Sequence, residues 1–419
     1  MDSTERDGLS PKGNVPNLRF PEFQGEWEKC KLGDLSAKVG SGSTPKGGNA
    51  VYTSAGHCFV RSQNVGMGYL ILDDVAHIND GIHQKHKATE LKEDDVLLNI
   101  TGASIGRTAI ATKEIEGGNV NQHVCIIRAN SKVSPKFLCN YIQTKKIQNY
   151  IQSLQTGGSR EGLNFEQIRS FPISLPNIAE QNKIAQLFDK LNERIATQNK
   201  IIDKLQSLIK GLQDNLLDNP LWKKTYLRSF LQFFPTNSLS WEQLSYEEGE
   251  IRNLHYGLIH GFQTRGINSA SLPMIKNEAI PKQYTLCQVG DVAFADASED
   301  TGEIAKSVEF VNTIEGDTIC GLHTIHGRDI KNRTVIGFKG FAFNSRYFHN
   351  QIKRLAQGTK VFSITANNLS SCYVYLPDLD TQTAIVKLLR SYEEQLIIGR
   401  LILKQYENQK QYLLRQMFI

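Results

Sequence analysis

LPNIAEQNKIAQLFDKLNE (Leu175–Glu193) and LPDLDTQTAIVKLLRSYEE (Leu376–Glu394) are two copies of one pattern. Leu-Pro opens both copies, and Gln181 corresponds to Gln382 at an offset of 201 residues. The same offset continues in both directions, where it aligns Gly157 with Gly358, Leu163 with Ile364, Leu205 with Tyr406, Leu212 with Leu413 and Leu216 with Met417. Self-similarity at a fixed offset indicates an internal repeat, so the chain consists of two related halves.

A heptad pattern follows each Leu-Pro start. Apolar residues return after steps of four and three at Ile184, Phe188, Leu191, Ile195, Ile202, Leu205, Ile209, Leu212 and Leu216, and in the second copy at Ile385, Leu389, Tyr392, Leu396, Leu403, Tyr406, Leu413 and Met417. This spacing predicts two long helices, each with one apolar seam. Asn219-Pro220 ends the first helix, and about 40 residues at 1.5 Å each give a rod of roughly 60 Å.

Two such seams should pack against each other, because neither can leave its apolar stripe in water. A whole domain links the two helices, which permits an antiparallel pair related by a pseudo-twofold axis, with the variable domains at opposite ends. The expected helix-pair interface is Ile184, Phe188, Leu191, Ile195, Ile202, Leu205, Ile209 and Leu212 with Leu389, Tyr392, Leu396, Leu403, Tyr406 and Leu413. Gly399 and Lys410 interrupt the second seam. The alternative is that the helices cover separate cores.

The segments in front of the helices have the texture of strand-rich domains. Short apolar runs at Val96–Ile100, Thr108–Ala111 and Val124–Ile127 alternate with glycine-containing turns. One helix is predicted over Pro135–Leu154 and its counterpart over Phe338–Ala356. The predicted fold class is mixed α+β. The predicted organisation is an N-terminal extension (1–22), a first strand-rich domain (23–174), a central long-helix region (175–222), a second strand-rich domain (223–375) and a C-terminal long helix (376–419).

Composition places the chain among ordinary globular proteins. It has 419 residues, 40% of them hydrophobic, and a net charge of +5, which fits two to three domains. No apolar run approaches the ~20 residues that span a bilayer, and the polar start is no signal peptide. The seven cysteines are scattered and never form C-x-x-C. They are interpreted as free, buried thiols of a cytoplasmic protein rather than zinc ligands or disulfides.

Basic residues gather at equivalent places in the two halves. Between Arg128 and Arg169 seven Lys and Arg stand against two acidic residues, and between Arg328 and Lys360 eight stand against one. Two such windows suit a protein that contacts phosphates on two segments of duplex DNA. The alternative for each window is a solvated helix face.

No catalytic motif is found. Gly102–Thr108 is one residue short of a P-loop and has Arg in place of Lys, and neither [ND]-P-P-[YF] nor H-E-x-x-H occurs. Asp74 followed by Glu90-Leu91-Lys92 has the pattern of a nuclease, but the pattern is short and common by chance. The prediction is therefore a protein without catalytic residues or metal ligands of its own.

Polar residues in turn-like segments could instead read base edges. The candidate DNA-binding residues of the first half are Thr44, Lys46, Arg61, Asn64, Thr101, Ser104, Arg107, Gln122, Lys145, Lys146 and Arg160. Those of the second half are His255, Tyr256, Arg265, Asp296, His323, Lys353 and Lys360. A single residue of this kind, taken alone, more often belongs to an ordinary surface loop than to a DNA contact.

These residues resemble the specificity subunits of Type I restriction–modification systems over nearly the whole chain. The motifs that carry the resemblance are Val15–Pro21 with Gly25–Trp27, Lys31–Leu35, Gly42–Pro45, Asp95–Arg107, Asn119–His123, Asn253–Gly257, Phe294–Asp300 and Gly321–Thr324, and the two Leu-Pro-x-x-x-x-Gln helix starts. Asp95–Arg107 with Asn119–His123 is the most specific match.

The resemblance implies a non-catalytic subunit whose two target-recognition domains read a bipartite, asymmetric site in double-stranded DNA. It implies that the helices dock two modification subunits, which bind S-adenosylmethionine and methylate adenine, and that restriction subunits join in the full complex. No cofactor is expected on this chain, since S-adenosylmethionine, ATP and Mg²⁺ belong to the partners. The rival hypotheses are a nuclease or methyltransferase that reads its own target, and a protein–protein scaffold without a DNA role.

Overall fold

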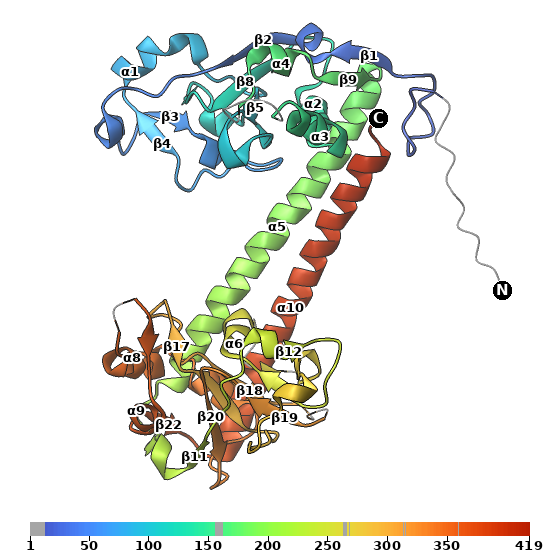
Figure 1. Cartoon of the computed structure of the whole chain (residues 1–419). Coiled ribbons are helices and arrows are strands. Elements are labelled where there is room, and N and C mark those ends of the chain that lie inside the picture. Colours follow the sequence, from blue (N-terminus) through green and yellow to red (C-terminus); the bar gives the residue numbers. More distant parts are fainter. Residues whose placement is uncertain are drawn as a thin grey trace, which may run out of the picture. The chain divides into compact units, whose positions relative to one another are not determined.

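The computed structural model describes residues 13–155, 162–262, 266–267, 269–312, 314, 316–358 and 360–419. The chain divides into two compact units: unit 1 comprises Met1–Asn199 and Ile402–Ile419, and unit 2 comprises Lys200–Leu401. Two long helices, α5 (Ile178–Leu217) and α10 (Leu379–Gln416), are drawn green and red in Figure 1. Each unit therefore contains the start of one long helix and the end of the other. No helix of the described residues is long and apolar enough to cross a membrane.

Unit 1 contains two larger sheets, which are connected by the turn between β7 and β8, and one two-stranded sheet. Its strands are β1 (Glu28–Lys31), β2 (Ser36–Ser41), β3 (His57–Val60), β4 (Ala76–Ile78), β5 (Val96–Asn99), β6 (Thr108–Ile110), β7 (Asn119–Val120), β8 (Val124–Ala129) and β9 (Pro172–Leu175). Its shorter helices are α1 (Asp80–Lys85), α2 (Pro135–Ile142), α3 (Lys145–Ser153) and α4 (Phe165–Arg169). The strand orders are β2-β8-β5-β6, β4-β3-β7 and β1-β9.

Unit 2 repeats these sheets and adds one strand to each of the two larger ones. Its strands are β10 (Lys223–Tyr226), β11 (Leu231–Phe234), β12 (Leu244–Ser245), β13 (Arg252–Leu254), β14 (Gly266–Ile267), β15 (Met274–Ile275), β16 (Val292–Ala295), β17 (Ala297–Ser298), β18 (Ser307–Phe310), β19 (Thr318–Cys320), β20 (Thr324–Asp329), β21 (Phe362–Ser363) and β22 (Tyr373–Leu376). Its shorter helices are α6 (Tyr256–Gly261), α7 (Phe338–Ala342), α8 (Arg346–Leu355) and α9 (Ala366–Ser370). The orders β11-β20-β16-β18-β14, β12-β15-β13-β19 and β10-β22 mirror unit 1, which confirms the internal repeat and the mixed α+β fold.

The long helices run antiparallel, as expected. In unit 1, Phe188 near the start of α5 shares a core with Leu414 and Met417 at the end of α10. In unit 2, Leu217 at the end of α5 shares a core with Leu389 near the start of α10. The ends of the helices are thus also built into the domain cores, so the expected pair and the alternative of separate cores are each partly right.

The predicted seam is the inward face of both helices. None of the predicted seam residues from Ile184 to Leu216 and from Ile385 to Met417 is exposed, and the positions of Gly399 and Lys410 are buried as well. The two interruptions therefore continue the buried face rather than opening it to solvent.

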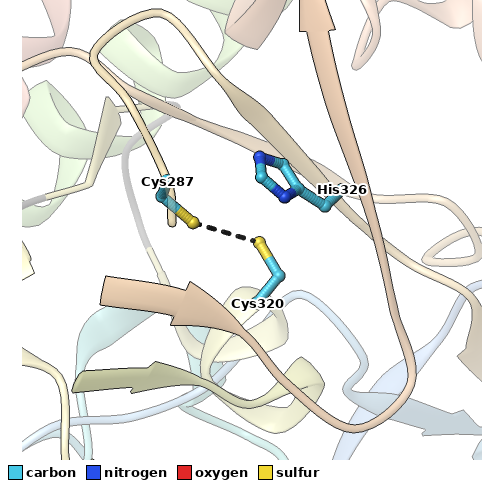
Figure 2. A group of neighbouring side chains, drawn as sticks. All are labelled: Cys287, Cys320 and His326. Carbon is cyan, nitrogen blue, oxygen red and sulfur yellow. Dashed lines mark hydrogen bonds between the residues drawn. The ribbon is translucent and has the colours of Figure 1, made fainter. Parts of the chain in front are cut away.

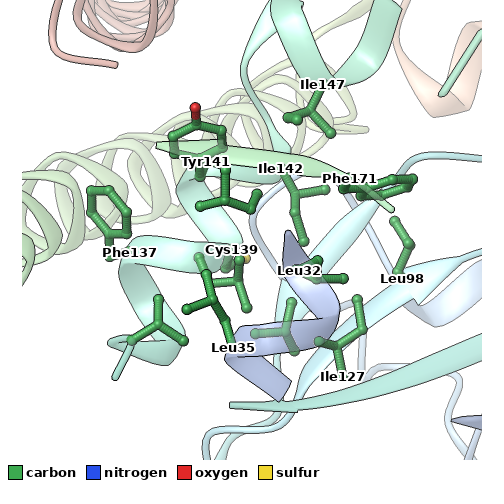
Figure 3. Packing of buried hydrophobic residues seen from close by; sticks show 14 of the residues in the cluster. Leu32, Leu35, Leu98, Ile127, Phe137, Cys139, Tyr141, Ile142, Ile147 and Phe171 are labelled. Atoms are coloured by element: carbon green, nitrogen blue, oxygen red, sulfur yellow. The ribbon is translucent and has the colours of Figure 1, made fainter. Parts of the chain in front are cut away.

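The core of unit 1 lies between the β2-β8-β5-β6 sheet and the helices. Figure 3 shows Leu98 and Ile127 from the sheet, Phe137, Tyr141 and Ile142 from α2, and Leu32, Leu35 and Phe171 from the connecting turns. All eight are at most 1% exposed. Burial of these large side chains fixes the sheet against α2, which positions the loops at the end of the strands.

The single helices predicted over Pro135–Leu154 and Phe338–Ala356 are each two helices, so that expectation was wrong. Thr144 interrupts the first, and its side chain accepts a hydrogen bond from the Ile147 amide. Ser345 interrupts the second in the same way and accepts from the Phe348 amide. A hydroxyl residue in extended backbone starts a new helix by capping it, and this local chemistry outweighs the continuous helical pattern.

Candidate nucleic-acid interface

One edge of unit 1 gathers the predicted loops. β3 runs parallel to β7, and Val60 is paired with Val120. β8 runs antiparallel to both β2 and β5, and pairs Cys125 with Ser41 and Leu98. The ends of β2, β3, β5 and β7 therefore meet at the start of β8. The loops that follow these strands contain the candidates Thr44, Lys46, Arg61, Asn64, Thr101, Ser104, Arg107 and Gln122.

A short hydrogen-bond chain joins three of these loops. The exposed Thr44 hydroxyl bonds the Gln122 side-chain oxygen. The Gln122 amide lies 3.0 Å from His123 Nε2, and His123 Nδ1 lies 2.6 Å from the Thr101 hydroxyl. Gln122 is exposed and is held by partners that are themselves polar, so it can present its amide to a base edge.

The other candidate residues of this edge differ in whether their side chains are exposed or are already bonded within the domain. Lys46 and Arg107 are exposed, and Ser104 Oγ accepts a 3.2 Å bond from the Asn99 amide. The Arg61 guanidinium lies 3.7 Å from the Asp74 carboxylate. Asn64 is 1% exposed, and its amide donates to the backbone oxygens of Ile71 and Asp74. The side chain of Asn64 is occupied inside the domain, so we remove it from the residues proposed to read bases.

Unit 2 presents an equivalent edge. The backbone bond from Ile100 N to His123 O, 3.0 Å, recurs from Asp296 N to His323 O at 3.0 Å. The bond from Asn121 N to Val60 O recurs from Gly321 N to Leu254 O. His323 is therefore the counterpart of His123, and His255, which follows Leu254, is the counterpart of Arg61.

The side chain of His323 is held through its Nδ1 atom, as that of His123 is. Its Nδ1 lies 3.0 Å from an oxygen of Asp296, and its ring meets Tyr256 edge-on at 5.2 Å between centroids. The backbone of His323 has φ 54°, a left-handed conformation that is costly for residues other than glycine and is concentrated at functional sites. Two histidines at one structural position, each held through Nδ1, are the clearest shared feature of the two edges.

His255 has a structural role beside this edge. It is 3% exposed, its Nδ1 accepts a hydrogen bond from the Gly257 amide, and burial, followed by the charge of His323, lowers the pKa of its imidazole. Trp241, 45% exposed, lies against it with ring centroids 4.4 Å apart. Trp241 is not among the candidate residues predicted from the sequence. A lone aromatic in a turn gives no signal until its neighbour is known.

The basic windows contribute less free charge than their counts suggest. Arg128 forms two 2.7 Å bonds with the buried Asp95, and Arg328 bonds Asp291 in the same manner. Lys339 is 2% exposed and lies 2.9 Å from the Glu309 carboxylate. Lys136 and Arg169 also have acidic partners, Asp189 and Glu166. These residues hold the domains together, which a charge count cannot distinguish from phosphate binding.

The candidate lysines outside these loops are exposed and lie in different segments of the chain. Lys145 begins α3, which contacts the loop at Gly106 through a 3.0 Å bond from Gln148. Lys146 bonds the backbone oxygen of Ile419 at 3.1 Å, and burial lowers the pKa of its amine. Lys353 and Lys360 are exposed. Arg160 and Arg265 lie outside the described residues.

Comparison with known proteins assigns a class to this architecture. A family model described as the Type I restriction modification DNA specificity domain matches residues 24–207. The matched residues contain the strands of unit 1 and most of α5, and the second half of the chain repeats their fold.

Relatives match along nearly the whole chain. The putative Type I restriction enzyme MjaX specificity subunit of Methanocaldococcus jannaschii is 21% identical over 95% of this chain and 94% of its own length. The MjaVIII specificity subunit of the same organism is 23% identical over 94% and 91%. The crystal structure of the S subunit of a Type I restriction–modification system from M. genitalium shares the fold, with a TM-score of 0.58 at 14% identity over 97% of this chain and 99% of that one.

Over nearly its whole length the chain is similar to the specificity subunits of Type I restriction–modification systems, and residues 24–207 match the model of their DNA specificity domain. Its role is recognition of DNA sequence within a system of that type. The resemblance seen in the sequence motifs is confirmed.

Proposed function

We propose that this chain reads a bipartite DNA site with the loop edges of its two units and carries no catalysis of its own. The observation that supports this most directly is the matched pair of edges, in which His123 and His323 occupy one structural position among exposed polar loops. The surroundings of the two histidines differ, Thr101 in one unit and Asp296 in the other. Different neighbours at matched positions suit a site whose two halves have different sequences.

The partners follow from the family. Two modification subunits would dock on the helices and supply S-adenosylmethionine-dependent adenine methylation, and restriction subunits would bring ATP, Mg²⁺ and nuclease activity. The long helices would act as a spacer, so that the half-sites lie about one helical turn apart, ~34 Å. The intervening bases would then be uncontacted.

Methylation mapping tests this proposal. The modification subunit encoded beside this chain is expressed with and without it, and methylated adenines are mapped by single-molecule sequencing. We expect a single split motif that appears only when the chain is present. Methylation that is unchanged by the chain, together with no binding between the two proteins, would refute the proposal.

A second assay separates the rival functions. The purified chain alone is incubated with DNA and either Mg²⁺ or S-adenosylmethionine, and its DNA affinity is measured at several salt concentrations. We expect no product, and binding that weakens as salt rises. Cleavage or methylation by the isolated chain would favour an enzyme, whereas DNA binding that is absent or independent of salt would favour a scaffold.

A further inference from the structure

Two cysteines and a histidine that are far apart in the sequence meet inside unit 2. Cys287 precedes β16, Cys320 ends β19 and His326 lies in β20. Their ligand atoms all lie within 4.8 Å of one another, and the three residues are 7%, 3% and 1% exposed. Figure 2 shows both thiols and the imidazole directed into one space. Thiolate and imidazole are the ligands that zinc prefers in proteins.

The same three positions are purely apolar in unit 1. The backbone bond from Cys287 N to Thr318 O, 2.8 Å, corresponds to that from Leu91 N to Gly118 O at 2.8 Å. Cys320 pairs with Leu254 in register as Val120 pairs with Val60. These matches make Leu91 the counterpart of Cys287 and Val120 the counterpart of Cys320.

The third position completes the set. His326 pairs with Ala293 as Ile126 pairs with Leu97. Leu91, Val120 and Ile126 lie together in one apolar cluster of unit 1 and are at most 1% exposed. The fold therefore needs only apolar packing at this place, and in unit 2 all three positions carry metal-ligand types instead. A requirement for packing alone does not account for that joint change.

The histidine is oriented as a metal ligand would be. His326 Nε2 lies 2.8 Å from Asp291 Oδ2, and Arg328 holds the same carboxylate through bonds of 2.8 and 2.7 Å. The ring nitrogen left over is Nδ1, and Figure 2 shows one ring nitrogen turned toward the thiols. A carboxylate that accepts from the far nitrogen of a ligating histidine is the usual second layer of a zinc site.

We propose that Cys287, Cys320 and His326 bind one zinc ion in unit 2. The two sulfur atoms lie 3.6 Å apart, close to the ~3.8 Å expected when two Zn–S bonds of 2.3 Å meet at the tetrahedral angle. Binding releases both thiol protons, so Zn²⁺, two thiolates and a neutral imidazole form an uncharged centre that suits a buried place. The described residues supply three ligands, and water fills the fourth position.

The ion would link three parts of the second recognition domain. Cys320 and His326 flank the turn that carries His323, and Cys287 ties the segment before β16 to them. Zinc would thereby stiffen the base of the loop edge in unit 2, whereas unit 1 achieves the same with apolar packing. This inference is independent of the proposed target and partners.

The test compares the full chain with a variant that carries the residues of unit 1, C287L/C320V/H326I. Both are purified under reducing conditions without chelator, and zinc is measured by mass spectrometry. We expect about one zinc per chain in the wild type and less than about a tenth of that in the variant. The control Cys372→Val removes another buried cysteine of unit 2 and should keep the metal.

A spectroscopic readout covers the case in which the variant does not fold. Reduced, metal-free wild-type chain is titrated with Co²⁺, and we expect a thiolate-to-cobalt charge-transfer band that saturates at one ion per chain and disappears when Zn²⁺ is added. A reduced wild-type chain that contains no zinc and gives no cobalt band would overturn the proposal. So would a native disulfide between Cys287 and Cys320, because it would remove both thiolate ligands.

Discussion

At the scale of single residues, the two halves are held by the same buried polar contacts. Gln181 is 1% exposed, accepts a 2.8 Å bond from the Ser134 amide and donates to the backbone oxygens of Lys132 and Pro176. Gln382 makes the matching set with Val335, Arg333 and Pro377. The glutamine that both helix starts share is thus the residue that attaches each long helix to its domain.

Gln181→Leu should destabilise unit 1. The substitution keeps an apolar volume but leaves buried backbone groups without partners, so we expect a loss of roughly 2–4 kcal/mol in the free energy of unfolding. Urea unfolding followed by circular dichroism measures it. Gln186→Leu, on the exposed side of the same helix, is the control and should change little.

Lys410→Met should stabilise unit 1. Lys410 is 8% exposed on the inward face of α10, and burial lowers the pKa of its amine below the ordinary value of 10.5. Replacing a buried charge by an apolar side chain of similar size should gain about 1–3 kcal/mol.

The gain of Lys410→Met should depend on pH. Below the lowered pKa both the folded and the unfolded wild type are protonated, so the full cost of burying the charge applies. As pH rises through the folded pKa toward 10.5, the folded state loses its proton first and the cost declines. Unfolding of variant and wild type across this range checks it, and a gain that increases with pH would contradict the explanation.

His123→Ala and His323→Ala should each alter one half of the recognised site. Loss of His123 removes the hydrogen-bond partner of the Gln122 side-chain nitrogen, and loss of His323 removes the partner of Asp296. Methylation mapping should show relaxed preference in one half-site per variant, with a cost of about 1–3 kcal/mol for the cognate base. Lys360→Ala, an exposed change on the surface of unit 2, should instead weaken binding to all sequences alike. Loss of both half-sites from one histidine variant would contradict independent reading.

At the scale of elements, a uniform heptad pattern carries two kinds of helix packing. Seam residues near the helix ends belong to domain cores, Phe188 in unit 1 and Leu389 in unit 2, while those between are half-buried or buried along the same face. Periodicity reports which face is inward but not what covers it. That is why the seam was predictable residue by residue, whereas the choice between a helix pair and separate cores was not.

Removing one heptad from both helices should shorten the spacer of the target. Deletion of residues 197–203 and of the equivalent residues 398–404 preserves the seam, and removes about 10.5 Å of each helix at 1.5 Å per residue. We expect methylation mapping to show about three fewer bases between unchanged half-sites. An unchanged spacer would contradict the role of the helices in setting it.

At the scale of the whole molecule, the two units share one fold but carry different side chains at matched positions. The strand orders of the two units correspond, and the Asp95–Arg128 pair of one is repeated as Asp291–Arg328 in the other. Residues close to these fixed points vary, as Leu91, Val120 and Ile126 against Cys287, Cys320 and His326 show. A shared backbone with exchangeable side chains is what reading two unrelated half-sites requires.

The repeat, the two long helices with their inward face, and the strands at Val96, Thr108 and Val124 could be predicted from the sequence, because periodicity and offsets are local properties of the chain. The family motifs could be read there as well. The folded structure was needed to show that Asn64 is buried, that much of the basic charge is paired, and that Cys287, Cys320 and His326 meet. Each of these depends on contacts between strands that are distant in the sequence, and the pairing of β13 with β19 or of β16 with β20 is not encoded in any short stretch.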